Sequence, residues 1–162
     1  MNAINRARLS TSLLSELFDY EEDAYRLSLR EADRIGSGPP AVALRGVVAH
    51  ANDALEDLPG LAAIRDVRLG SAGSLLLDTF HRVRDAIADQ LSDQEHGYRR
   101  ALATLHQGID LVRLTRDAAG NEGDVALAAW CERWLEVRER FVADATRELA
   151  WFAAHPLLAH AA

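Results

Sequence analysis

Apolar residues recur at the helical period of 3.6 along most of the chain, and no segment shows a convincing period of two. Breaks rich in Gly, Pro and Ser divide this pattern into four long apolar stripes. A chain with four such stripes can bury them by packing the helices against one another. We therefore expect an all-α fold, an antiparallel four-helix bundle. Because the stripes are almost wholly apolar, few interior positions could carry chemistry.

Composition indicates one domain spanning 1–162 and disfavours two classes of partner. The net charge is -7, and acidic residues accompany every Arg run, which argues against nucleic acid and against a membrane surface. All 18 basic residues are Arg, a bias typical of a GC-rich bacterial genome. One cysteine, Cys131, excludes an internal disulfide. Apolar runs are too short for a signal peptide or membrane span, so we expect a cytoplasmic protein.

The first half of the chain predicts a helical hairpin. We expect the first helix from about Ser10 to Arg34, ended by the Gly36–Pro40 break. The second begins near Pro39 or Pro40, and Leu58-Pro59-Gly60 closes it. The inward stripe of the first helix comprises Leu14, Phe18, Glu21, Tyr25 and Ala32, and it is flanked by Leu13, Leu17 and Ala24.

A crossover linker is expected between Leu61 and Gly73, before the third stripe. That stripe runs from Leu76 to Val112 and predicts either one long helix or two helices in line. Ser92 with Glu95 three residues later has the form of a capping box and marks the possible break.

The turn at Asp117 to Asp124 is dense in Gly, Asn and Asp, and Gly120 is its candidate helix cap. The last helix is expected from about Val125 to Phe152. Its inward residues are Leu127, Trp130, Trp134, Val137, Phe141, Ala145, Leu149 and Phe152.

The sequence contains no phosphate-binding loop, nucleophile elbow or HExxH motif. Several His and carboxylate residues lie close together along the predicted helices, so each such group could ligate one metal ion. Groups of this kind are more often solvated pairs on the protein surface. These sets are His50 with Asp53, Asp78 with His81 and Asp85, Glu95 with His96, and His106 with Asp110.

Glu21 is the strongest single candidate, because a carboxylate between Phe18 and Tyr25 on the inward face needs a compensating cation, metal or hydrogen-bond donor. A pairing with an Arg, or a position at the edge of the stripe, is the structural alternative. Glu148 lies similarly between Ala145 and Phe152. If Glu21 is buried and unpaired, Glu21→Gln should be neutral or stabilising, whereas loss of a metal ligand should destabilise.

The opening LLSELFDYEED, the Ala-rich second helix, the crossover and the short polar turn resemble the ferritin-like superfamily, especially its small bacterial members. This resemblance implies a di-iron ligand at Glu21. The full pattern also requires Glu-x-x-His on two other helices, which this chain lacks. The substitutes are His50 and Asp53 beside Glu21, and Glu95 beside Glu148. Hairpin arithmetic places the two groups at levels that differ by about 10 Å.

Two functions follow. The first is a metal-free, non-catalytic bundle of ferritin-like descent that works through self-association or a protein partner, with three Trp as candidate interface anchors. The alternative is an iron or manganese protein in oxidation, peroxide removal or iron sequestration, with Glu21, His50, Asp53, Glu95 and Glu148 as ligands. A third possibility is a small-molecule site lined by Tyr98, Trp130, Trp134 and Phe141.

Overall fold

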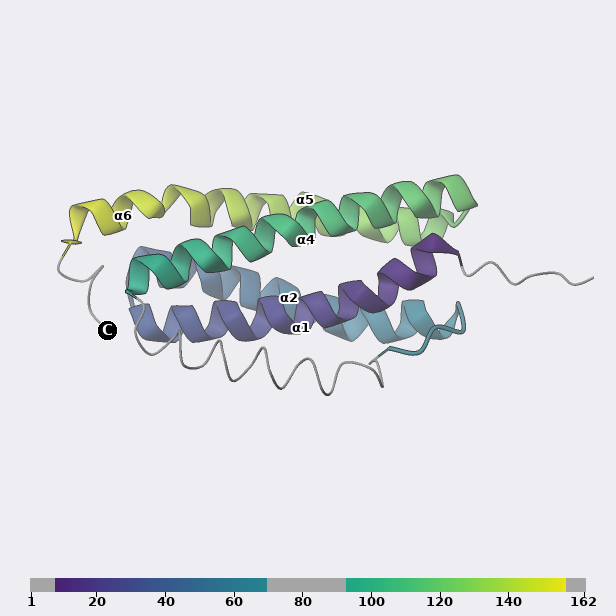
Figure 1. Ribbon diagram of the computed structural model, residues 1–162, viewed down its shortest axis with the longest axis horizontal. Helices are drawn as coiled ribbons and strands as arrows, with labels where there is room; N and C mark the ends of the chain where they lie inside the picture. Colours follow the sequence, from purple (N-terminus) through teal and green to yellow (C-terminus); the bar gives the residue numbers. More distant parts are fainter. Residues whose placement is uncertain (1–7, 70–92, 157–162) are drawn as a thin grey trace, which may run out of the picture.

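The computed structural model describes residues 8–69 and 93–156, which form helices joined by short turns, without any strand. The long helices are α1 (Leu9–Ile35), α2 (Pro39–Ala63), α4 (Gln94–Glu122) and α5 (Val125–Arg147), and a short α6 (Leu149–Ala154) follows (Figure 1). The prediction of an all-α fold in which four helices pack together is confirmed. None of the described helices is both long enough and apolar enough to cross a bilayer.

Each long helix has two main neighbours. Helix α1 packs on α2 and α4, and α5 packs on the same two helices, so α1 and α5 occupy opposite corners of the bundle. Ser10 at the start of α1 bonds to Glu122 at the end of α4, and the Gln94 side chain at the start of α4 donates to the Arg34 carbonyl at the end of α1. Neighbouring helices therefore run in opposite directions, as the ribbon shows (Figure 1).

The hairpin between α1 and α2 forms as its Gly and Pro residues dictate. Gly36 ends α1 with φ 85°, and Pro39 and Pro40 occupy the first turn of α2. The predicted end of the second helix at Leu58-Pro59-Gly60 is wrong, because α2 continues through Pro59 to Ala63. Leu58 and Ala62 are buried on either side of Pro59, and this packing keeps the segment helical despite the missing amide hydrogen.

The turn between α4 and α5 is shorter than predicted. Gly120 lies inside α4, and Gly123 is the residue that ends the helix, with φ 76° in the left-handed region. Ala118 and Ala119 are buried before Gly120, and Glu122 after it bonds to Ser10 of α1, so the last turn is held on both sides of Gly120. Asp124 then caps α5 by accepting a hydrogen bond from the Leu127 amide at 3.1 Å.

Two further boundaries differ from the expected long helices. The backbone is extended at Asp93, so the Leu76–Val112 stripe is interrupted just before α4. Ser92 and the first half of that stripe lie outside the described residues. The last helix is interrupted at Glu148, after which α6 brings Phe152 into the core.

The buried face of each helix is close to the predicted one, with a shift of one residue in several places. Val137 and Phe141 are half-buried, whereas their neighbours Arg138 and Val142 are buried. On α1, Leu17 and Ala24 are buried, while Phe18 and Tyr25 are half-buried. The shift on α5 places a charged side chain in the interior.

Candidate functional site

The centre of the bundle contains an ion pair between opposite corners. Arg138 Nη2 of α5 lies 2.6 Å from Glu21 Oε2 of α1, and both side chains are completely buried. Because the two helices are diagonal neighbours, the contact spans the interior rather than bordering one helix pair. Burial on this scale requires compensation of each charge, and each residue supplies it for the other.

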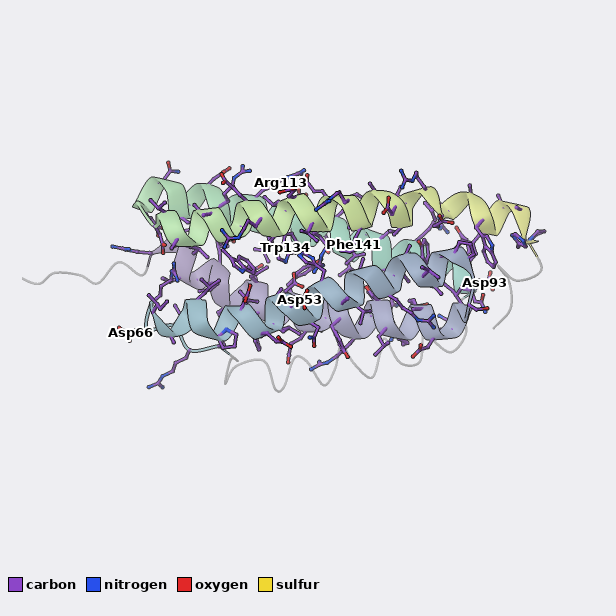
Figure 2. The ribbon with its side chains drawn as sticks, turned by 180° about the vertical axis from the view of Figure 1, so that it is seen from behind. Asp53, Asp66, Asp93, Arg113, Trp134 and Phe141 are labelled. Carbon is purple, nitrogen blue, oxygen red and sulfur yellow. The ribbon has the colours of Figure 1, made fainter. Side chains whose placement is uncertain are left out.

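Arg138 also contacts two groups on its other edges. Its Nε donates to His50 Nδ1 of α2 at 3.0 Å, and its guanidinium carbon lies 4.6 Å from the centre of the Trp134 ring. The His50 ring is 5.5 Å from Trp134 and 6.1 Å from Phe141. Figure 2 shows Trp134 and Phe141 between the ribbons in the middle of the molecule. We call Glu21, His50, Trp134 and Arg138 the central cluster.

The surroundings of the central cluster change how its groups titrate. Burial raises the pKa of Glu21, and the Arg138 charge opposes this rise. Burial lowers the pKa of His50 to about 4, and the positive Arg138 lowers it further in the same direction. His50 is therefore neutral at pH 7, which leaves Nδ1 free to accept the hydrogen bond from Arg138.

The central cluster is held by further polar contacts around the ion pair. Glu21 Oε1, Arg138 Nη1 and Trp134 Nε1 form no hydrogen bond of ideal geometry. The Trp134 and Arg138 side chains nevertheless both act on Glu21 as hydrogen-bond donors and oppose the rise of its pKa. The Glu21–Arg138 pair itself is joined through one carboxylate oxygen, Oε2.

Helix α4 approaches the central cluster through Tyr20 of α1. The Tyr20 hydroxyl donates to the Leu105 carbonyl of α4 at 3.4 Å, and a side chain at Gly108 would overlap the Tyr20 ring. Burial raises the pKa of Tyr20, so the phenol stays protonated beside the ion pair. Glycine at 108 is what lets this ring lie between α1 and α4.

The predicted ligand residues are found at different places. Glu21 and His50 come together, both bound to Arg138. Asp53 is exposed on α2 (Figure 2). Glu95 is half-buried and pairs with Arg99 at 2.6 Å. Glu148 is half-buried at the junction of α5 and α6. Burial raises the pKa of Tyr98, and the negative charge of Glu148 raises it further.

These positions do not fit an iron or manganese centre. In the parts of the chain that the structure describes, no three His, Cys, Asp or Glu side chains form a group that could hold a metal ion. The guanidinium of Arg138 lies against Glu21 where a ligand carboxylate would need its metal. We derive no chemistry through a metal at this site.

Sequence reasoning missed Arg138 and a second buried carboxylate, Glu31. Glu31 binds Arg34 at 3.0 Å and Arg30 at 3.2 Å, and it lies against Gly97 of α4. A signal was present on α1, because six of its buried positions follow one another at alternating spacings of three and four residues. These six are Leu14, Leu17, Glu21, Ala24, Ser28 and Glu31. Following that spacing places both carboxylates on the inner face.

The aromatic residues considered for a small-molecule site do not line one common space. Trp130 donates to Asp57 at 2.9 Å, whereas Tyr98 donates to the Ala145 carbonyl at 2.7 Å and packs on Phe152. Trp130 and Trp134 are buried, so they are core residues rather than exposed interface anchors. No protein-family model, curated protein or solved structure matches this chain.

Proposed function

We propose that this protein is a metal-free, non-catalytic helical bundle that works by protein–protein association. The observation that carries the proposal is the buried contact between Glu21 and Arg138. It supplies the cation that an interior carboxylate requires, and it supplies it from the chain itself. The interior then serves to hold the helices together, which leaves the surface for function.

A ferritin-like descent accounts for the layout of this bundle. The opposite directions of neighbouring helices and the inward carboxylate on the first helix support it. In this proposal Arg138 replaced the metal of an ancestral centre, and His50 remains as a neutral hydrogen-bond acceptor.

Exposed apolar side chains at one end of the bundle support the proposed association. Leu9, Ile64 and Val125 are exposed by 53, 81 and 77% respectively, and they come from α1, from the residue after α2, and from α5. The α1–α4 and Arg65–Asp124 contacts place all three at the same end. We call these three residues the apolar end. Exposed large apolar side chains that gather at one place mark interaction surfaces.

The test is the oligomeric state of the purified protein by sedimentation velocity. We expect the wild type to self-associate, and we expect Ile64→Asp with Val125→Asp to shift it to monomer, because a charge at the apolar end opposes desolvation. Val42→Asp is the matched control, since Val42 is 61% exposed near the start of α2, at the opposite end. A monomeric wild type, or a control as disruptive as the double variant, would contradict association through the apolar end.

A further inference from the structure

The last long helix is interrupted at a place where its sequence contains no helix breaker. Neither Gly nor Pro occurs between Val125 and Ala154, so this segment favours one continuous helix. The structure nevertheless separates α5 from α6 at Glu148, whose amide bonds to both the Asp144 and the Ala145 carbonyl, at 3.3 and 3.2 Å. The local sequence does not explain this break, and its cause therefore lies in the packing of the helices.

A tyrosine of α4 contacts the chain at the break. The Tyr98 hydroxyl donates to the Ala145 carbonyl in the last turn of α5 at 2.7 Å, and both residues are completely buried. A side chain that bonds a carbonyl in the last turn of a helix satisfies a group that lacks a partner there and can set where the helix stops. Thr146 acts in the same direction, because its hydroxyl donates to the Val142 carbonyl at 2.7 Å, a contact that bends helices.

Helix α6 closes the end of the core at which α4 begins (Figure 1). Phe152 is buried, and its ring lies 5.2 Å from the Tyr98 ring. The Trp151 ring meets Phe152 edge-on at 5.2 Å, and a side chain at Gly38 would lie 3.2 Å from the same indole. The break therefore directs one aromatic side chain onto Tyr98 and a second onto the start of α2.

We propose that α6 is a hinged cap over this end of the bundle, and that the Tyr98–Ala145 hydrogen bond holds it closed. The closed form is the one that the structure shows, with Phe152 in the core. In the open form α5 continues through Glu148 as the single helix that its sequence favours, and the Phe152 ring leaves Tyr98. Opening thus uncovers two aromatic rings at the end opposite to the apolar end. The proposal does not depend on the proposed function, because both forms leave the apolar end unchanged.

The distance between two spin labels tests the proposal in the full-length protein. The labels are placed at the exposed positions of Ala49→Cys on α2 and Ala154→Cys on α6, and pulsed dipolar spectroscopy measures their separation. The native Cys131 is buried, and burial raises its thiol pKa to about 12, so it is not labelled. We expect one distance in the protein with no other change. Phe152→Ala removes the ring that anchors α6, so a second distance should appear, and adding Tyr98→Phe should raise the ratio of the second to the first about fivefold or more.

Two controls separate opening of the cap from loosening of the bundle. Labels at Ala49→Cys and Ala143→Cys, which lies on α5 before the break, should keep one distance in every variant. Tyr25→Phe, combined with Phe152→Ala in place of Tyr98→Phe, removes a hydroxyl elsewhere and should leave the ratio unchanged.

A proline variant identifies the open form. Ala150→Pro lies in the first turn of α6, where Pro is tolerated, but it would interrupt a continuous helix. Added to Phe152→Ala with Tyr98→Phe, it should therefore remove the second distance.

Three results would overturn the proposal. If Tyr98→Phe leaves the ratio unchanged, its hydroxyl does not hold the cap. If the control pair on α5 changes as well, the bundle as a whole has loosened. If the second distance persists with Ala150→Pro, the open form is not a continuous helix.

Discussion

Arg138 is the residue that brings the polar side chains of the interior together. Its guanidinium neutralises Glu21, donates to His50 and lies over the Trp134 ring, so three elements contribute to one planar group. Arg suits this position because its donors point in several fixed directions and its faces accept an aromatic ring. The positive Arg138 thus lies against one negative carboxylate, one neutral imidazole and the face of one aromatic ring.

Glu21→Gln should destabilise the protein by about 3–5 kcal/mol, because it leaves the buried Arg138 charge without its counter-charge. This reverses the sign expected for an unpaired carboxylate, since the structure shows the pair. Urea unfolding at pH 7 gives the free energy of unfolding. The control is Glu21→Leu with Arg138→Met, which removes both charges and should recover most of the loss. A double variant less stable than Glu21→Gln would reject this account of the pair.

His50 should make the protein less stable in mild acid. Its pKa is about 4 in the folded protein against 6.5 for a free imidazole, so the unfolded chain binds a proton first. The stability that neutral His50 contributes is complete above about pH 6.5 and is lost as the pH falls toward 4. The difference in unfolding free energy between wild type and His50→Gln should shrink over this window. A difference that stays constant would show that burial and the Arg138 charge do not lower the pKa of His50 in the folded protein.

Sequence reasoning identified Glu21 and His50 but not their partner. An Arg is usually exposed, and the apolar Val137 next to it appeared to continue the inward stripe. A helix of 3.6 residues per turn allows either neighbour to face inward, and only the packing of α5 against α2 and α4 selects Arg138. The charge on Glu21 predicted that some compensating group exists, without saying which helix provides it.

At the scale of the helices, the sequence predicted an all-helical chain with four helices packed together, which the described residues confirm, but several helix ends could not be predicted. Gly36, Pro39 and Pro40 fixed the first turn through backbone constraints that act locally. The predicted ends at Gly120 and Pro59 were wrong because each helix makes contacts beyond them: Ala62 is buried after Pro59, and Glu122 after Gly120 bonds to Ser10 of α1. Local breakers therefore predict a helix end only where packing does not continue beyond them.

Gly120 and Gly123 should respond oppositely to alanine. Gly123 adopts φ 76°, so Gly123→Ala should destabilise by about 1 kcal/mol. Gly120 lies within α4 with open space around its Cα, so Gly120→Ala should stabilise by about 0.5–1 kcal/mol. Thermal and urea unfolding of the two variants provide the comparison. Destabilisation at 120 with no effect at 123 would mean that the helix ends where the sequence suggested.

At the scale of the whole molecule, polar contacts join the helices at both ends of the bundle and across its middle. The Arg65–Asp124 pair and the Ser10–Glu122 bond lie at the apolar end. At the opposite end, Glu31 pairs with Arg34 and lies against Gly97 near the start of α4. Glu21 and Arg138 join α1 and α5, which are diagonal neighbours without a main interface. The centre therefore links the two hairpins, and it does so with groups that the chain supplies.

The most direct test of this account is the thermal unfolding of Glu21→Gln and wild type, each measured with and without a metal chelator. If Arg138 is the partner of Glu21, the variant should melt below the wild type by the same margin in both buffers, and chelator should leave the wild type unchanged. A destabilisation that disappears in chelator, because the wild type itself falls to the level of the variant, would show that Glu21 binds a metal and would contradict the metal-free interior.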